Sequence, residues 1–230
     1  MADSKISALA EVTDFQATDE LVLARASSTK KIKGSTILDA SGMALISDTV
    51  LGADTASFDV QNIPQGYKHL MIELTARCTT AATYEELLMR LNNDSSGIYE
   101  SFTYYFTSAG ASGASDGGTT ATSFDAGQIP AATADANKFG VAEIKLLDYV
   151  SSNYKAIQSD TSASRTTAAG QRVRVLGAGT WASTAAVSRI TLLPGSGSLK
   201  AGSRLTLYGL GGTPSAVSVT SNLVNYLFSR

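Results

Sequence analysis

Few side chains of this chain could take part in catalysis. His69 is the single histidine and Cys78 the single cysteine among the 230 residues. A Ser–His–Asp triad would have to use His69, but the sequence contains no Gly-x-Ser-x-Gly segment that would position a nucleophilic serine. A zinc site is excluded on count, because only these two side chains offer a nitrogen or sulfur ligand. We therefore expect no enzymatic activity, no metal and no cofactor, with Cys78 a small buried residue.

Acidic and glycine-rich segments also lack the pattern of a site. Glu85 and Glu86 are adjacent, so in a strand they would point to opposite faces, whereas a glycosidase needs two carboxylates that converge in a cleft. Residues 92–97 lack the ligand spacing of a calcium loop, and we interpret them as an Asx turn, with calcium as the alternative. Residues 195–202 lie between two expected strands and precede no helix, so we interpret them as a hairpin connection and not a phosphate loop.

The candidates for surface contact lie in segments without a regular pattern. No Lys or Arg occurs between Arg90 and Lys138, and residues 107–138 are expected to form a long loop. Such loops are usually functional or mobile, so Asp116 is a candidate surface contact, the alternative being a tolerated insertion. Trp181, the only tryptophan, lies among Gly, Ala and Ser. It could stack on a sugar ring, which makes it a second candidate surface contact, but we favour an anchor in an interface or in the core.

Composition and charge exclude further classes of function. The chain has 18 Lys and Arg against 20 Asp and Glu, a net charge of −2, so no basic surface is available for nucleic acid. Charged residues make up 17%, below the roughly 25% of typical soluble domains. The first residues lack the apolar stretch of a signal peptide, and no run of about 18 apolar residues could insert into a membrane. We therefore expect assembly in the cytoplasm.

Alternation of apolar and polar residues predicts antiparallel strands. Leu70, Ile72 and Leu74 would share one face of a strand at 70–77, with Glu73 on the other. The same reasoning predicts further strands at 98–106, 140–147, 171–176, 187–193 and 203–210. Short strands separated by Gly-rich turns indicate an all-β protein with a jelly-roll-like antiparallel β-sandwich. We assign residues 55–212 to this domain and residues 41–54 to a linker.

The first 40 residues form a separate module in this interpretation. Residues 19–25 and 29–34 read as two short strands around a turn at Ser27, and a hairpin of this size is marginal in water without a partner surface. We interpret residues 1–40 as an attachment arm. The residues expected to carry the attachment are Lys5, Ile6, Leu9, Leu21, Leu23, Lys31 and Ile32.

The end of the chain, residues 213–230, is interpreted as a tail that packs on its own domain or on another subunit. Of these two, we favour the contact between subunits. Its apolar residues are Leu223, Tyr226, Leu227 and Phe228.

These segments resemble a known class of protein. The order Lys-Ile-Ser-x-Leu at 5–9, Asp-Glu-Leu-Val-Leu at 19–23 and Thr-Lys-Lys-Ile at 29–32 is similar to the N-terminal attachment segment of tailed-bacteriophage appendage proteins: tail fibres, spikes and head fibres. Residues 58–70, with Ile63-Pro64-Gln65-Gly66-Tyr67, resemble the opening strand of small virion β-domains. Residues 90–99 and 202–210 resemble other parts of these domains. The resemblance spans most of residues 5–210, apart from 107–139.

The resemblance also bears on residues 83–90, which carry a capping-box pattern of Thr83 with Glu86. Local sequence alone predicts a short helix here, whereas the resemblance implies a strand over 87–91. We favour the strand.

The resemblance implies a structural virion protein, assembled in the host cytoplasm and located in the virion. Its partners would be other virion proteins of the tail, portal, collar or capsid, and two further copies of itself in a homotrimer. The loop at 107–138 would contact the host surface, where a glycan is a candidate partner. One alternative is a capsid decoration or head-fibre protein, and another is a carbohydrate-binding or carbohydrate-active β-sandwich.

Overall fold

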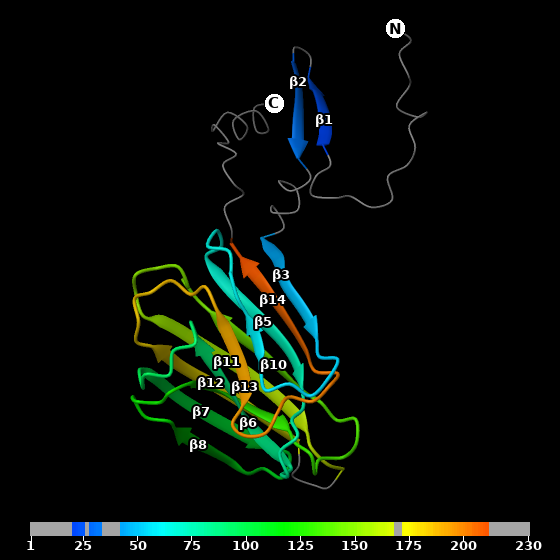
Figure 1. Cartoon of the computed structure of the whole chain (residues 1–230), viewed down its shortest axis with the longest axis vertical. Helices are drawn as coiled ribbons and strands as arrows, with labels where there is room; N and C mark the ends of the chain where they lie inside the picture. Colours follow the sequence, from blue (N-terminus) through cyan, green and yellow to red (C-terminus); the bar gives the residue numbers. More distant parts are fainter. Residues whose placement is uncertain (1–19, 26–27, 34–41, 168–171, 212–230) are drawn as a thin grey trace. The chain divides into compact units, whose positions relative to one another are not determined.

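The computed structural model describes residues 20–25, 28–33, 42–167 and 172–211, shown in colour in Figure 1. The chain divides into two units, residues 1–42 with 213–230, and residues 43–212. In the first unit, β1 (Glu20–Arg25) and β2 (Ser28–Lys33) pair as an antiparallel hairpin, with Leu21 opposite Ile32. This confirms the hairpin predicted from the sequence.

The second unit is an antiparallel β-sandwich, and its described residues form no helix. The confirmed fold class is therefore all-β. The larger sheet has the strand order β3 (Met43–Val50), β14 (Arg204–Leu210), β5 (His69–Ala76), β10 (Gly140–Leu146), β11 (Lys155–Ser164), β12 (Arg172–Trp181), β7 (Tyr99–Thr107) and β8 (Ser112–Asp116). The smaller sheet has the order β4 (Phe58–Val60), β13 (Ile190–Pro194), β6 (Tyr84–Leu91) and β9 (Phe124–Pro130).

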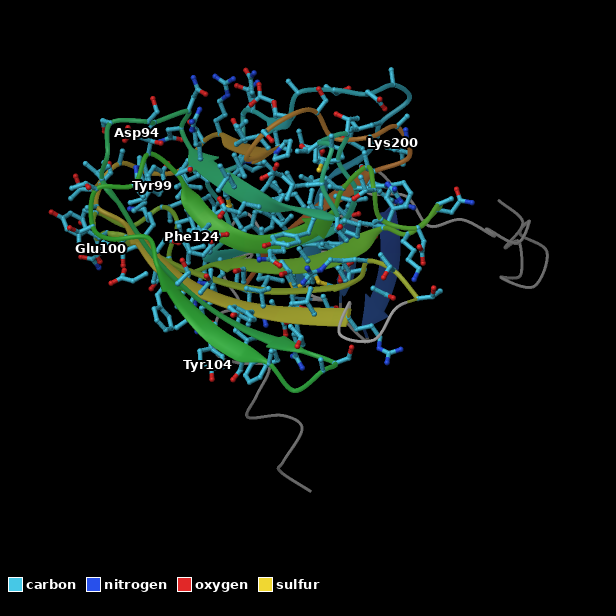
Figure 2. The ribbon with its side chains drawn as sticks, turned by 90° about the horizontal axis from the view of Figure 1, so that it is seen from below. Asp94, Tyr99, Glu100, Tyr104, Phe124 and Lys200 are labelled. Atoms are coloured by element: carbon cyan, nitrogen blue, oxygen red, sulfur yellow. The ribbon has the colours of Figure 1, made fainter. Side chains whose placement is uncertain are left out.

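The core lies between the two sheets and follows from strand alternation. In β10, Ala142, Ile144 and Leu146 are buried, whereas Val141, Glu143 and Lys145 between them are exposed. The same period of two runs through the neighbouring strands β5, β11 and β12. Figure 2 shows the result, with Phe124 between the layers and Tyr104 on the outside of the larger sheet.

The approach of β9 to the larger sheet depends on glycine in β12. A Cβ atom at Gly179 would lie 2.1 Å from the carbonyl oxygen of Glu100 and 2.8 Å from the Phe124 ring. Gly127 of β9 has a φ of +120°, and a Cβ there would lie 2.2 Å from Oγ1 of Thr161. Side chains at these two positions would push the sheets apart.

Two segments differ from the sequence-based expectation because strand pairing, and not local pattern, defines them. Residues 43–50, assigned above to a linker, form β3 and pair along the whole of β14. Residues 107–138, expected to be one long loop, contain β8, at one edge of the larger sheet, and β9, at one edge of the smaller sheet. Both segments are short of large apolar residues in alternation, so their pairing partners determine their structure.

Two further predictions have clear outcomes. Residues 84–91 form β6, which confirms the strand and rejects the helix, because β6 pairs with β13 on one side and β9 on the other. Residues 195–202 do not form a hairpin connection, since β13 belongs to the smaller sheet and β14 to the larger one. The segment passes from one sheet to the other, with Leu199 buried and bridged to Thr55 and Cys78.

Candidate functional site

The predicted attachment and tail residues fall largely outside the described part of the chain. Lys5, Ile6 and Leu9 lie outside it, as do the tail residues Leu223, Tyr226, Leu227 and Phe228. Leu21, Leu23, Lys31 and Ile32 belong to the β1–β2 hairpin, in which Lys31 is opposite Val22 and Leu23 is opposite Lys30. The attachment role of these residues stays a prediction.

Trp181 is a core residue, which agrees with the favoured interpretation of an interface or core anchor and rejects the candidate surface contact with a sugar. Only 2% of it is exposed, and its ring is stacked on Tyr99 with the centroids 6.5 Å apart. Its indole N–H donates to Oδ2 of Asp94 at 3.0 Å. The Gly- and Ala-rich sequence around it is a packed strand, β12, and not a loop.

Asp94 forms the Asx turn expected at 92–97. Its Oδ1 accepts hydrogen bonds from the hydroxyl and the backbone N–H of Ser96, at 2.6 and 2.8 Å. These bonds, with the one from Trp181, hold the pKa of the Asp94 carboxyl below its ordinary value, against the opposing effect of burial. The turn is thereby joined to the core.

The two residues with catalytic side-chain types both have structural roles. Nδ1 of His69 accepts the backbone N–H of Asp148 at 3.1 Å, at the start of β5. Cys78 is fully buried in the core, as predicted. Among the described residues, no group of three or more His, Cys, Asp or Glu side chains is arranged to hold a metal ion.

A candidate binding surface is the face of the larger sheet that points away from the core, here called the outer face. Strand register arranges its side chains in rows across the sheet. One row runs through Met71, Lys145, Gln158, Ala178 and Phe102, and the next through Glu73, Glu143, Asp160, Leu176 and Tyr104. Residues from five strands that are distant in sequence are thus brought together.

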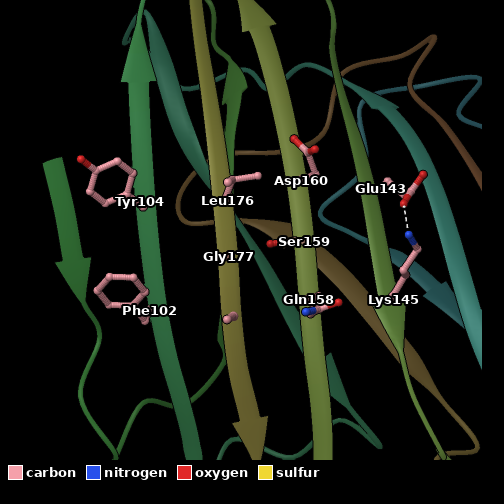
Figure 3. A pocket seen from close by; sticks show the side chains of 10 residues that line it. Phe102, Tyr104, Glu143, Lys145, Gln158, Ser159, Asp160, Leu176 and Gly177 are labelled. Atoms are coloured by element: carbon pink, nitrogen blue, oxygen red, sulfur yellow. Dashed lines mark ion pairs between the residues drawn. The ribbon is translucent and has the colours of Figure 1, made fainter. Parts of the chain in front are cut away.

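A hollow of about 510 Å³ lies on this face over β7, β12, β11 and β10. Figure 3 shows its lining from close by, with Phe102 and Tyr104 on one side and Glu143 and Lys145 on the other. Ala178 lies on the floor, directly between Phe102 and Gln158 in the row, so the short side chain leaves the space open. This volume is within the range of roughly 300–1,000 Å³ of small-molecule sites.

Exposed aromatic residues form one wall of the hollow. Phe102 points outward from β7, and 47% of it is exposed. Tyr104 lies two residues further along β7 on the same face and contacts Phe106 edge to face, with ring centroids 4.8 Å apart. Leu176 of β12, 40% exposed, adds to the apolar surface. Exposed apolar side chains that gather in this way commonly mark a binding surface.

Charged groups form the opposite wall. Glu143 lies directly between Glu73 and Asp160 across the sheet, and like charges at opposed positions are destabilising. Lys145 Nζ contacts Glu143 at 2.7 Å, and Arg174 holds Asp160 through two parallel hydrogen bonds, one of 2.9 Å from its Nε. The side-chain amide of Gln158 has no hydrogen bond to another described residue, so its donors and acceptor are available to a ligand.

Two neighbouring hollows extend the same face. One, of about 650 Å³, is lined by residues of β5, β10, β11 and β14, including Glu73 and Arg204. The other, of about 550 Å³, adjoins Phe102 and includes Asp116. Asp116 is exposed, and its Oδ1 accepts the backbone N–H of Gly118 at 2.9 Å. Its role as a surface contact stays a prediction.

Sequence reasoning missed this surface although it identified its parts. The aromatic residues of 98–106 and the alternation of 140–147 each predict a strand. What sequence did not show is that β12 and β11 lie between them. A signal was present in Phe102, Tyr104 and Phe106, because alternate aromatic residues place large rings on one face of a strand.

No protein-family profile matches the chain, and a comparison with curated proteins finds no match. Among solved structures, that of the infectious bursal disease virus Gt strain shows 14% identity and a TM-score of 0.11. The alignment covers 84% of this chain and 47% of that chain, so the chain spans about half the length of the structure it is compared with. A likeness of this degree carries no argument. Within the described residues, no helix has the length and apolar character needed to cross a membrane.

Proposed function

We propose that the protein is a structural component of a tailed-phage virion, with an N-terminal segment for attachment and a β-sandwich for display. The observation that carries the proposal is the division of the chain, in which the β1–β2 hairpin belongs to a unit separate from the sandwich. A two-stranded hairpin has too little core to be stable alone. Such a segment requires a partner surface, and the resemblance of residues 5–32 to phage attachment segments indicates what that surface is.

The sandwich is suited to display because it has a hydrophobic core of its own. Its core is continuous between the two sheets and includes the fully buried Leu70, Ile144 and Tyr149. Its outer face leaves aromatic and charged side chains accessible. The partners proposed are other virion proteins of the tail, collar or capsid, and two further copies of this chain in a homotrimer. The location proposed is the virion.

Deletion of residues 1–42 tests the proposal. We expect the truncated protein to keep the far-UV circular dichroism and cooperative unfolding of the sandwich, and to be absent from purified particles. The full-length protein, expressed to the same level, should sediment with the particles. Incorporation of the truncated protein at the full-length level would contradict the proposal.

A second candidate is a carbohydrate-binding or carbohydrate-active β-sandwich. The specific observation in favour of carbohydrate binding is the wall of Phe102 and Tyr104 next to Gln158 and Glu143. For hydrolysis, Glu143 and Asp160 would have to serve as the carboxylate pair. Each of them is engaged by a cation, Lys145 or Arg174, which is typical of structural ion pairs. Binding without hydrolysis is therefore the better-supported form of this candidate.

A further inference from the structure

We propose that the hollow on the outer face over β7, β12, β11 and β10 is a binding site for an oligosaccharide. The inference rests on the proposed display function, since it gives the ligand class that the displayed sandwich would contact. The site is distinct from Asp116 and Trp181, the residues that the sequence suggested. It is defined by Phe102, Tyr104, Glu143, Lys145, Gln158 and Ala178.

The first argument is the pairing of an aromatic wall with hydrogen-bonding side chains. A sugar ring has an apolar face of C–H groups, which packs on aromatic rings, and a rim of hydroxyls, which need donors and acceptors. Phe102 and Tyr104 supply the rings, and Gln158 supplies an amide without another described partner. The Glu143 carboxylate and the Lys145 ammonium supply charged acceptor and donor groups, whose hydrogen bonds are the stronger ones.

The second argument is the geometry of the floor. β7 and β10 are three strand spacings apart, which is about 14 Å at about 4.8 Å each. Between their side chains, β12 presents Ala178 and β11 presents Gln158. The hollow is therefore wide enough for more than one sugar ring, and Ala178 is the smallest of the side chains that cross it in this row.

The third argument concerns the other possible occupants. The backbone groups of β7, β12 and β11 are already paired on both sides, so a peptide could not add a strand here. A second copy of the chain is disfavoured because the cores of protein interfaces are depleted in charged residues, whereas Glu143, Lys145 and Asp160 line this hollow. Nucleic acid is disfavoured by the row of Glu73, Glu143 and Asp160. Of the occupants considered, a sugar is the one that fits, because the side chains of the hollow can bind its hydroxyl groups.

The site is open, so a single copy should bind weakly. Several copies on one particle would bind a repeating polysaccharide with a higher overall affinity, because each further contact is intramolecular. A shallow site is thus compatible with firm attachment by a homotrimer or by many copies of the chain on a virion.

The test is binding of the full-length protein to a printed array of bacterial O-chains, capsular polysaccharides and mammalian oligosaccharides, followed by calorimetric titration of each glycan that binds. We expect at least one glycan class to bind. Tyr104→Ala should weaken binding about tenfold, which corresponds to about 1.4 kcal/mol, whereas Tyr104→Phe should keep most of it. Ala178→Ile should abolish binding by filling the floor, with an exposed β-branched residue that a strand accommodates.

Tyr154→Ala is the matched control, because Tyr154 is 61% exposed and does not line the hollow. It should bind like the unchanged protein, and all variants should unfold within a few degrees of it. Absence of binding to every glycan on the array, or equal binding by the Ala178→Ile variant, overturns the proposal. Immunoblotting of purified particles measures incorporation of the protein separately from glycan binding. A protein that is incorporated but binds no glycan would overturn the binding site and leave the proposed virion function intact.

Discussion

Asp125 is expected to make the stability of the sandwich depend on pH. It lies in β9, where its Oδ1 accepts the Gly127 backbone N–H at 2.9 Å and its own N–H donates to the Ser101 hydroxyl at 3.0 Å. Burial raises the pKa of its carboxyl to about 6, the nearby Glu86 adds to this increase, and the Gly127 hydrogen bond opposes it.

The sign of the effect follows from the raised pKa. Between pH 3.8 and about 6 the folded protein holds the Asp125 proton more tightly than the unfolded chain does. The stabilisation is therefore complete below about pH 4 and is lost as the pH rises through about 6. A difference of about two pKa units, at about 1.4 kcal/mol per unit, gives a loss of about 3 kcal/mol at neutral pH.

Asp125→Asn removes this titration and keeps an oxygen that can accept the Gly127 N–H. We expect the variant to exceed the unchanged protein in free energy of unfolding by about 2–3 kcal/mol at pH 7.5, and to differ little from it at pH 4. Urea unfolding of both proteins at pH 4, 5.5 and 7.5 measures the difference, in which the titration of all other groups cancels. A difference that is the same at all three values would refute the reasoning.

The remaining predictions concern packing and buried polar groups. Gly179→Ala should lower the free energy of unfolding by at least about 2 kcal/mol, because its Cβ would lie 2.1 Å from the Glu100 carbonyl oxygen; urea unfolding tests this. Trp181→Phe should cost about 1–3 kcal/mol by removing the hydrogen bond to Asp94 and leaving a cavity, as measured by thermal unfolding. Lys155→Met should cost about 1–3 kcal/mol, since the fully buried Lys155 ammonium donates to three backbone carbonyls that would lose their partner. Urea unfolding of Lys155→Met tests this. A free energy of unfolding equal to that of the unchanged protein would contradict the argument that the ammonium stabilises the fold by binding these carbonyls.

The strands with clear alternation could be predicted from the sequence, because a strand buried on one face has an apolar residue at every second position. Leu70, Ile72 and Leu74 of β5 are the best example. The β1–β2 hairpin could be predicted from its turn. By contrast, β8 consists of small and polar residues, and only its pairing with β7 makes it a strand. Long-range pairing of this kind is not encoded in a local pattern.

The same limit explains the outcome for Trp181 and for the outer face. The Gly and Ala residues before Trp181 show no alternation of large apolar and polar side chains, whereas the structure requires Gly179 for the close approach of Phe124 across the sandwich. The hollow depends on the order of β7, β12, β11 and β10, which leaves Ala178 between two larger side chains. Strand order results from the whole topology, and sequence periodicity predicts only which residues face outward.

Immunogold labelling of intact particles with an antibody against the β-sandwich tests the central claim most directly. The account predicts gold on the particles. Label at the tail would indicate a fibre or spike, and label over the head would indicate a head fibre or decoration protein. Particles without gold, from a lysate in which the protein is abundant, would contradict the proposal that this chain is part of a virion.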